Sequence, residues 1–338
     1  GQFLERALTI NVTDVNDKPT GLFVQNPVTS LPELTTRPPT TPVVVVGPTA
    51  SGKSALALAL AERWGQAEIV SVDSMQVYRG MDIGTAKASH AQRARVPHHL
   101  LDLLDPSQEC SVAWFQQQAH QVLDDLARRG RRPILVGGTG LYHQAVVDGL
   151  EIPGRYPEVA AELEGEDDTA ALHRRLVDLD PVAAARMDPA NRRRVARALE
   201  VTLGSGRPFS SFGPGLASSP VTDWCLVGLA VDRVRSAERI ADRVRAMVEA
   251  GLVDEVARLL GRPGGLSRTA RQALGYREVI EHLEGRCTLE EAVELTVVRT
   301  RRFAVRQERW FRRDPRIRWF DAESPDLVHR VAGTVEPS

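Results

Sequence analysis

The chain has 338 residues, with 43 basic and 44 acidic side chains and a formal net charge of −1. Its length suits about two domains, and its 42 % apolar residues exclude wholesale disorder. Three widely spaced cysteines exclude a disulfide framework and a local zinc knuckle, and they indicate a reducing compartment such as the cytoplasm. No apolar run approaches the roughly 18 residues of a membrane span, so we expect no membrane partner.

The first 41 residues differ in pattern from the rest of the chain. Residues 7–20, ALTINVTDVNDKPT, resemble the closing strand and calcium-ligand motif of a cadherin repeat, but one strand cannot fold alone. Residues 27–42 are rich in Thr and Pro, which is typical of a linker. We therefore expect residues 1–41 to be a foreign-looking tail and linker that is disordered and has no part in function.

From Pro42 onward, strand patterns alternate with helix patterns. The run PVVVVG at 42–47 is β-branched and bounded by glycine, as in a buried parallel strand. Further strands are expected at 68–74 and 131–140, with helices at 55–64 and 111–129. This alternation predicts an α/β fold with a parallel sheet.

The pattern becomes helical between 151 and 221. This segment is charged and Ala-rich, and the strand pattern returns only with WCLVGLAVD at 224–232. We therefore predict a helical insertion at 151–221 within a core formed by 42–150 and 222–338. After that strand the sequence predicts helices at 235–260, 268–284 and 288–313, and a short strand at 317–321.

A phosphate-binding loop is predicted between the first strand and the first helix. GPTASGKS matches G-x-x-x-x-G-K-[S/T] in the strand–loop–helix context that the motif requires. Its glycines let backbone N–H groups face an anion, and the helix N-terminus adds partial positive charge. Lysine supplies a point charge, and the final serine can ligate Mg²⁺. The expected diphosphate- or nucleotide-binding residues are Gly47, Pro48, Thr49, Ala50, Ser51, Gly52, Lys53 and Ser54, with Ser54 as the metal ligand.

This loop does not by itself identify the phosphate compound. ATPases and kinases carry an acid at the end of a core strand, whereas the strand at 131–140 ends in glycines and Thr139. The only acid at a strand end near the loop is Asp73, in IVSVDS. It can hold Mg²⁺ indirectly, act as a base, or simply cap a helix or turn, and spacing supports these interpretations equally.

Arginine supplies nearly all of the positive charge, in two clusters. One lies at 192–197 and the other at 299–318. Basic faces of this kind attract phosphate backbones. A solvated, arginine-rich helix face is the alternative interpretation for each cluster.

Seven segments carry a family resemblance when they are taken in order. They are GPTASGKS, SVDSMQVYRGMDIGTAK at 71–87, PHHLLD at 97–102, LVGGTGLY at 135–142, RRVARALEV at 193–201, ALGYRE at 273–278 and RRFAVRQERWFRR at 301–313. Together they resemble the tRNA dimethylallyltransferases, also called tRNA isopentenyltransferases, of the bacterial type. The resemblance extends from about Pro42 to Asp321, and the long block at 71–87 makes it specific.

The resemblance implies transfer of a dimethylallyl group from dimethylallyl diphosphate to N6 of the adenine on the 3′ side of the anticodon of tRNA. Diphosphate is released. The implied fold is a P-loop, nucleotide-kinase-like parallel sheet with a helical insertion and a helical C-terminal region. The loop in this family binds diphosphate, although the motif is often described as ATP-binding. Mg²⁺ is the implied cofactor, and we expect a cytoplasmic monomer.

Three residues match catalytic positions of that family: Asp73, Thr139 and Arg233. A carboxylate at Asp73 would orient the adenine amine and take its proton. Thr139 matches a residue near the target base and the diphosphate, but it could instead cap the following helix. Arg233 matches an arginine that reaches the diphosphate, and its alternative is a surface residue at a helix start.

Contacts with tRNA are implied in two further places. The adenine must leave its stack to react, and a glutamine can pair with an adenine edge. In the helical insertion, the arginines align with a Gln-Arg-x-x-Arg motif, with arginine in place of the glutamine. The expected tRNA-binding residues are Asp73, Ser74, Met75, Gln76, Thr139, Arg193, Arg194 and Arg197.

Two other functions remain as alternatives. A small-molecule P-loop kinase would turn over ATP without tRNA, but the block at 71–87 and the glycine-ended strand count against it. A non-catalytic nucleic-acid-binding module could keep a nucleotide-responsive loop. The intact set of Lys53, Ser54, Asp73 and Thr139 argues against that second alternative.

Overall fold

The computed structural model describes residues 41–213, 216 and 218–336. The expected tail and linker at 1–41 therefore lies outside the described residues, except for Thr41. Within the described ranges, no helix combines the length and the apolar character needed to cross a lipid bilayer.

A single parallel sheet organises the core. Six strands lie in the order β3-β2-β4-β1-β5-β6, and every neighbouring pair is parallel. The central strand is buried along its whole length, which explains its unbroken run of valines. The predicted α/β class and parallel sheet are thus confirmed. The strands are β1 (Val43–Val46), β2 (Ala67–Ser71), β3 (His98–His99), β4 (Arg132–Gly137), β5 (Cys225–Ala230) and β6 (Arg318–Asp321).

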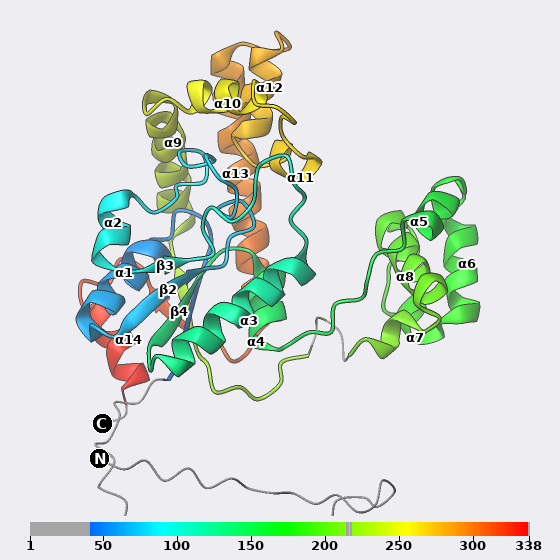
Figure 1. Cartoon of the computed structure of the whole chain (residues 1–338), viewed down its shortest axis with the longest axis horizontal. Coiled ribbons are helices and arrows are strands. Elements are labelled where there is room, and N and C mark those ends of the chain that lie inside the picture. Colours follow the sequence, from blue (N-terminus) through cyan, green and yellow to red (C-terminus); the bar gives the residue numbers. More distant parts are fainter. Residues whose placement is uncertain (1–40, 214–215, 217, 337–338) are drawn as a thin grey trace, which may run out of the picture. The chain divides into compact units, whose positions relative to one another are not determined.

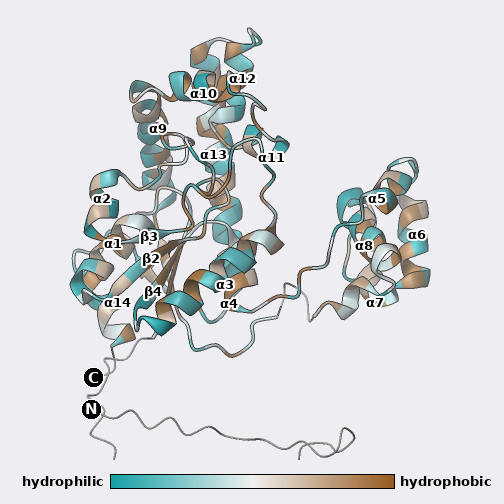
Figure 2. Ribbon diagram, in the orientation of Figure 1, coloured by the Kyte–Doolittle hydropathy of each residue, from teal (hydrophilic) through white to brown (hydrophobic). Residues whose placement is uncertain are grey.

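Helices cover both faces of this sheet (Figure 1). Val43 and Val45 face an apolar cluster with α1 (Lys53–Trp64) and α14 (Leu327–Val335), while Val44 and Val46 face a cluster with α3 (Val112–Arg128) and α4 (Gly140–Val147). This alternation follows from the two-residue period of a strand. In Figure 2 the inner strands of the sheet are coloured mostly hydrophobic, whereas the helices around it mix both colours. The short helix α2 (His90–Arg95) precedes β3.

The C-terminal region is helical, but it has more breaks than the sequence predicts. The expected helix at 235–260 is divided at Gly251, whose φ is 97°, and the expected helix at 268–284 is divided before Gly275, whose φ is 87°. Both values lie in the left-handed region, where glycine ends or restarts helices. The helices are α9 (Arg233–Glu249), α10 (Leu252–Leu260), α11 (Arg268–Arg271), α12 (Tyr276–Leu283) and α13 (Leu289–Phe311).

The segment between β4 and β5 also contains helices that share a small apolar core. Leu172 and Leu176 pack against Val195 and Leu199, all of them buried. The helical character agrees with the sequence, whereas the boundaries 151 and 221 and a role in tRNA binding stay predictions. The elements are α5 (Pro157–Glu164), α6 (Thr169–Leu179), α7 (Pro181–Ala185), α8 (Arg192–Ser205) and the 3₁₀ helix η1 (Phe209–Ser211).

Candidate active site

The phosphate loop follows the central strand and leads into α1. Gly47 has a φ of 155°, and a Cβ there would lie 2.9 Å from Ser51 Oγ and 3.1 Å from the Leu229 carbonyl oxygen. Ala50 and Gly52 have φ values of 63° and 87°. A left-handed non-glycine residue stores strain, which concentrates at functional loops. The first N–H groups of α1 lack partners within the helix, so the loop has the geometry of an anion cradle.

Lys53 lies at the base of this cradle. Its Nζ donates to the Pro48 carbonyl oxygen over 3.1 Å. Burial, reinforced by the positive charge of Arg243 and opposed by Asp73, lowers the pKa of Lys53 to about 8. A buried ammonium beside a second cation gains stability when an anion arrives. Ser54, next in the chain, is exposed and could reach a metal ion at the same place.

Asp73 and Thr139 follow the ends of the neighbouring strands β2 and β4. Asp73 Oδ1 accepts a hydrogen bond from the Met75 N–H over 2.9 Å, and Thr139 Oγ1 lies 3.4 Å from the Ser74 nitrogen, which donates to it. Thr139 occupies the N-cap of α4, yet its hydroxyl makes no capping bond. Capping therefore does not explain this threonine, and both side chains line the same cavity.

Gln307 of α13 bridges the phosphate loop and the end of β4. Its Oε1 accepts from the Thr49 N–H over 2.8 Å, and its Nε2 donates to the Gly138 carbonyl oxygen over 2.9 Å. A Cβ on Gly138 would lie 2.1 Å from that Nε2, and one on Gly140 would lie 2.2 Å from the Trp310 ring. Gly138 and Gly140 thus make room for α13. In the sequence Gln307 is only one residue of the C-terminal arginine cluster, so its bridging role was missed.

These elements enclose a cavity of about 380 Å³. One part is polar and includes the phosphate loop, the β2 and β4 ends, and Arg243. Another part is apolar and comes mainly from α9, α10 and α13. The lining residues used below are Thr49, Asp73, Ser74, Met75, Gly84, Thr85, Thr139, Ile240, Arg243, Val244, Met247, Phe303 and Gln307.

The structure brings a different arginine to this cavity from the one expected. Arg233 is the first residue of α9 and is exposed, and it does not line the cavity. Arg243 lies ten residues later, roughly 15 Å along the helix axis. Burial lowers its pKa, while nearby Asp73 opposes that shift. The available signal was its position on the apolar face of α9, between Ile240 and Met247.

The Gln76 side chain makes its hydrogen bonds within the protein, to Ser71 and to Thr85. Its Oε1 accepts from the Ser71 hydroxyl over 2.7 Å, and its Nε2 donates to the Thr85 carbonyl oxygen over 3.0 Å. Asp73, Ser74 and Met75 line the cavity, whereas Gln76 does not. Because both ends of its amide are engaged, this geometry does not offer Gln76 to an adenine edge.

The three arginines expected to bind tRNA differ in their surroundings. Arg193 and Arg194 are exposed on the first turn of α8. Arg197 is partly buried, pairs with Glu200 at 2.6 Å, and donates to the carbonyl oxygens of Pro153 and Gly154 over 2.9 Å each. Two of the three are thus presented to solvent, while the third holds the chain that leads into the helical segment.

The donor set fits Mg²⁺ held partly by a substrate. Among the described residues, no three His, Cys, Asp or Glu side chains form a metal-binding group. Mg²⁺ retains water and is commonly bound by few protein ligands together with substrate phosphates. The exposed Ser54 hydroxyl at the phosphate loop suits that mode, with Asp73 near enough to influence the charge of Lys53.

Comparison with known proteins gives a consistent family. The IPP transferase family model matches residues 76–314, and the isopentenyl transferase model matches residues 42–102. The tRNA dimethylallyltransferase of Pseudarthrobacter chlorophenolicus is 51 % identical over 299 residues, covering 87 % of this chain and 98 % of that protein. The tRNA dimethylallyltransferase of Thermobifida fusca is 50 % identical over 305 residues, covering 87 % and 94 %.

Solved structures agree with these relatives. The tRNA isopentenylpyrophosphate transferase of Bacillus halodurans has a TM-score of 0.64 and 40 % identity, covering 87 % of this chain and 94 % of that one. A eukaryotic dimethylallyltransferase acting on tRNA has a TM-score of 0.71 and 27 % identity, covering 87 % and 76 %. The phosphate loop, the glycine-ended strand and the cavity between them thus occur in a chain that belongs to the tRNA dimethylallyltransferase (IPP transferase) family.

Proposed function

We propose that this enzyme transfers a dimethylallyl group from dimethylallyl diphosphate to N6 of the adenine on the 3′ side of the anticodon of tRNA. The observation that carries the proposal is one cavity lined by Thr49 of the phosphate loop, by Asp73 and Arg243, and by an apolar wall. Lys53 of the same loop lies close enough to Arg243 and Asp73 for their charges to shift its pKa. This combination suits an anionic leaving group, a small branched hydrocarbon and a proton acceptor.

The phosphate loop and the two cations bind the diphosphate. As the allylic C1–O bond breaks, its electron pair passes to the diphosphate oxygen, and negative charge grows there. Lys53, Arg243 and the backbone N–H groups of the loop stabilise this charge in a site that is already arranged for it. Ser54 would hold Mg²⁺, which supplies further neutralisation of the diphosphate when it is bound.

The dimethylallyl group occupies the apolar wall. Ile240, Val244 and Met247 flank Arg243 on α9, and Phe303 lies on α13. Five carbons of hydrocarbon gain roughly 0.8 kcal/mol per buried CH₂-sized group. The apolar wall therefore holds the donor's carbon chain beside the cations that bind its diphosphate.

Asp73 orients and deprotonates the acceptor. The adenine amine is a poor nucleophile because its lone pair is delocalised into the ring. A carboxylate that accepts a hydrogen bond from N6–H aims that nitrogen at C1 and receives the proton as the C–N bond forms. Thr139, beside Ser74 at the neighbouring strand end, supplies a hydroxyl to the same region.

The tRNA itself extends beyond this cavity. The exposed Arg193 and Arg194 suit contacts with backbone phosphates, and the adenine must be unstacked to enter. That the enzyme works as a cytoplasmic monomer belongs to the same proposal. A small-molecule kinase is not favoured, since the relatives are named as transferases acting on tRNA.

The test is transfer of labelled dimethylallyl to unmodified tRNA in the presence of Mg²⁺, with separation of the digested nucleosides. We expect label in N6-dimethylallyladenosine, and none with a tRNA whose target adenine is replaced by guanine. Asp73→Asn keeps the shape of the side chain but removes its basicity, so kcat should fall about 10²–10⁴-fold. ATP turnover that does not depend on tRNA, without labelled nucleoside, would reject the proposal in favour of the kinase.

A further inference from the structure

Two crossings connect the sheet with the helical segment, and one arginine contacts both. The chain leaves after Asp148, the C-cap of α4, and returns past Pro220 to β5. Arg316, between α13 and β6, reaches both places. Resting on the proposed function, we infer that Arg316 and Gln144 are positioning residues. They hold in place the two chain crossings that connect the helical segment to the sheet, and they thereby set the affinity for tRNA.

All three nitrogens of the Arg316 guanidinium make hydrogen bonds where the two crossings meet the core. Its Nη1 and Nη2 lie 2.8 and 3.3 Å from the two carboxylate oxygens of Asp148, and Nη1 also donates to the Pro220 carbonyl oxygen over 2.7 Å. Asp314 binds Nη2 at 2.7 Å and Nε at 2.9 Å. The Asp148 side chain is 2 % exposed and that of Arg316 16 %. Only a planar, forked guanidinium can serve two carboxylates and a carbonyl together.

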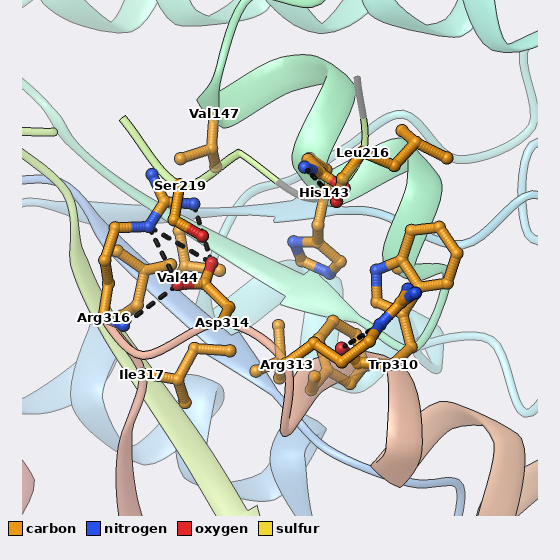
Figure 3. Close-up of a pocket in the computed structure, with 15 residues that line it drawn as sticks. Val44, His143, Val147, Leu216, Ser219, Trp310, Arg313, Asp314, Arg316 and Ile317 are labelled. Carbon is orange, nitrogen blue, oxygen red and sulfur yellow. Dashed lines mark hydrogen bonds and ion pairs between the residues drawn. The ribbon is translucent and has the colours of Figure 1, made fainter. Parts of the chain in front are cut away.

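Gln144 holds the returning chain one turn earlier on α4. Its Nε2 lies 3.2 Å from the Leu216 carbonyl oxygen and 3.3 Å from that of Ser218, and donates to both. Figure 3 shows Leu216, Ser219 and Arg316 around one cavity on the α4 side of β1. The returning chain is therefore attached to the core through the carbonyls of Leu216, Ser218 and Pro220.

The outgoing chain is attached just as closely. Gln116 of α3 donates to the Leu150 carbonyl oxygen over 2.9 Å, and Arg197 of α8 holds Pro153 and Gly154. Between these fixed points the backbone comprises only Glu151 and Ile152. When a ligand is bound to one of two units joined by a short linker, the other unit is present at a high effective concentration. The core and the helical segment are joined in this way.

In the proposed function, one tRNA contacts both the exposed arginines of α8 and the catalytic cavity, which is the cavity lined by Asp73, Thr139 and Arg243. Releasing the two crossings from the core lengthens the flexible chain between the core and the helical segment, and this lowers the effective concentration of the second binding unit. Neither Gln144 nor Arg316 lines the catalytic cavity, so donor binding and chemistry should be preserved. The signature is a higher KM for tRNA with an unchanged kcat and an unchanged KM for dimethylallyl diphosphate.

The experiment compares Gln144→Ala, Arg316→Ala and the double variant with the wild-type protein. We expect the double variant to raise the KM for tRNA about tenfold, the equivalent of about 1.4 kcal/mol, with each single variant giving a smaller rise. Arg316→Lys keeps the charge but loses the fork, so it should resemble Arg316→Ala. Arg330→Ala is the matched control and should leave the KM for tRNA unchanged, because Arg330 of α14 lies outside both arginine clusters and its contacts are with Ser324 and Phe320.

Hydrogen exchange of the free protein tests the structural part separately. Amides at 148–152 and 218–222 should exchange faster in the double variant, while those of β1 should not change. Faster exchange with an unchanged KM for tRNA, or unchanged exchange, would overturn the inference, as would a fall in kcat alone. If Arg316→Ala does not fold, Arg316→Lys provides both measurements. If the wild-type protein transfers nothing to tRNA, the proposed function is wrong. The inference can then still be tested by comparing the affinity of the wild-type protein and of the double variant for tRNA without donor.

Discussion

Glu255 of α10 anchors one wall of the catalytic cavity, and its removal should be among the most costly single changes in the protein. The carboxylate is 2 % exposed. It accepts from the N–H groups of Asp82, Ile83 and Gly84 over 3.0, 2.9 and 3.3 Å, and from the Tyr276 hydroxyl over 2.5 Å. A Cβ on Gly84 would lie 2.4 Å from the Tyr276 ring, so this loop rests directly on the ring.

The magnitude follows from these four bonds. A hydrogen bond to a charged group contributes about 1.5–3 kcal/mol, and a buried donor left without a partner costs about 1–3 kcal/mol. Tyr276→Phe removes one bond and leaves three, so we expect a loss of about 1.5–2 kcal/mol. Glu255→Ala leaves three partly buried N–H groups and the buried Tyr276 hydroxyl without their acceptor, and its loss should reach about 4–5 kcal/mol.

Urea unfolding followed by circular dichroism measures these losses. Glu249→Ala, at an exposed glutamate of α9, is the control and should stay within about 0.5 kcal/mol of wild type. Because Gly84 and Thr85 line the cavity, the Tyr276→Phe enzyme should also show a higher KM for tRNA. A loss below about 1.5 kcal/mol for Glu255→Ala would mean that the 82–84 loop finds other partners, and would refute this account.

Three further predictions concern the donor side of the cavity. Since burial lowers the pKa of Lys53 to about 8, this lysine is charged below pH 8 and neutral above it. Diphosphate affinity, measured by calorimetry, should therefore be flat below pH 8 and fall by up to about tenfold per pH unit above it, and Lys53→Met should abolish that dependence. Arg243→Ala should raise the KM for dimethylallyl diphosphate about 10–100-fold, while Arg233→Ala should change it less than about twofold; equal effects would contradict the assignment. Gln307→Glu cannot donate to the carbonyl at the end of β4 and adds negative charge beside the diphosphate. Steady-state kinetics should show kcat/KM for the donor about 10–100-fold lower, and a wild-type value would show that the bridge is dispensable.

Several features of this protein are determined by local sequence. The valines of β1 are buried on both faces of the sheet, so their unbroken run predicts a central parallel strand. The GPTASGKS loop depends on backbone conformations and on an adjacent helix start, which neighbouring residues encode. The order of the motifs from the loop to RRFAVRQERWFRR was enough to indicate the family, which the comparisons confirm.

Other features depend on residues that are distant in the sequence. Arg243 is one of five arginines of α9, and only the packing of that helix against the site distinguishes it from Arg233. Gln307 lies 258 residues from Thr49, and the hydrogen bond between them forms only when α13 crosses the phosphate loop.

Glycine shows the same division between local and tertiary causes. Gly52 adopts a left-handed backbone conformation that a local motif predicts. Gly138 and Gly140 have no such requirement in the sequence, and they are small because Gln307 and Trp310 of α13 occupy the space a Cβ would need. Backbone conformation is a local property that a sequence pattern reveals, whereas steric contact between distant segments is decided only when the chain has folded.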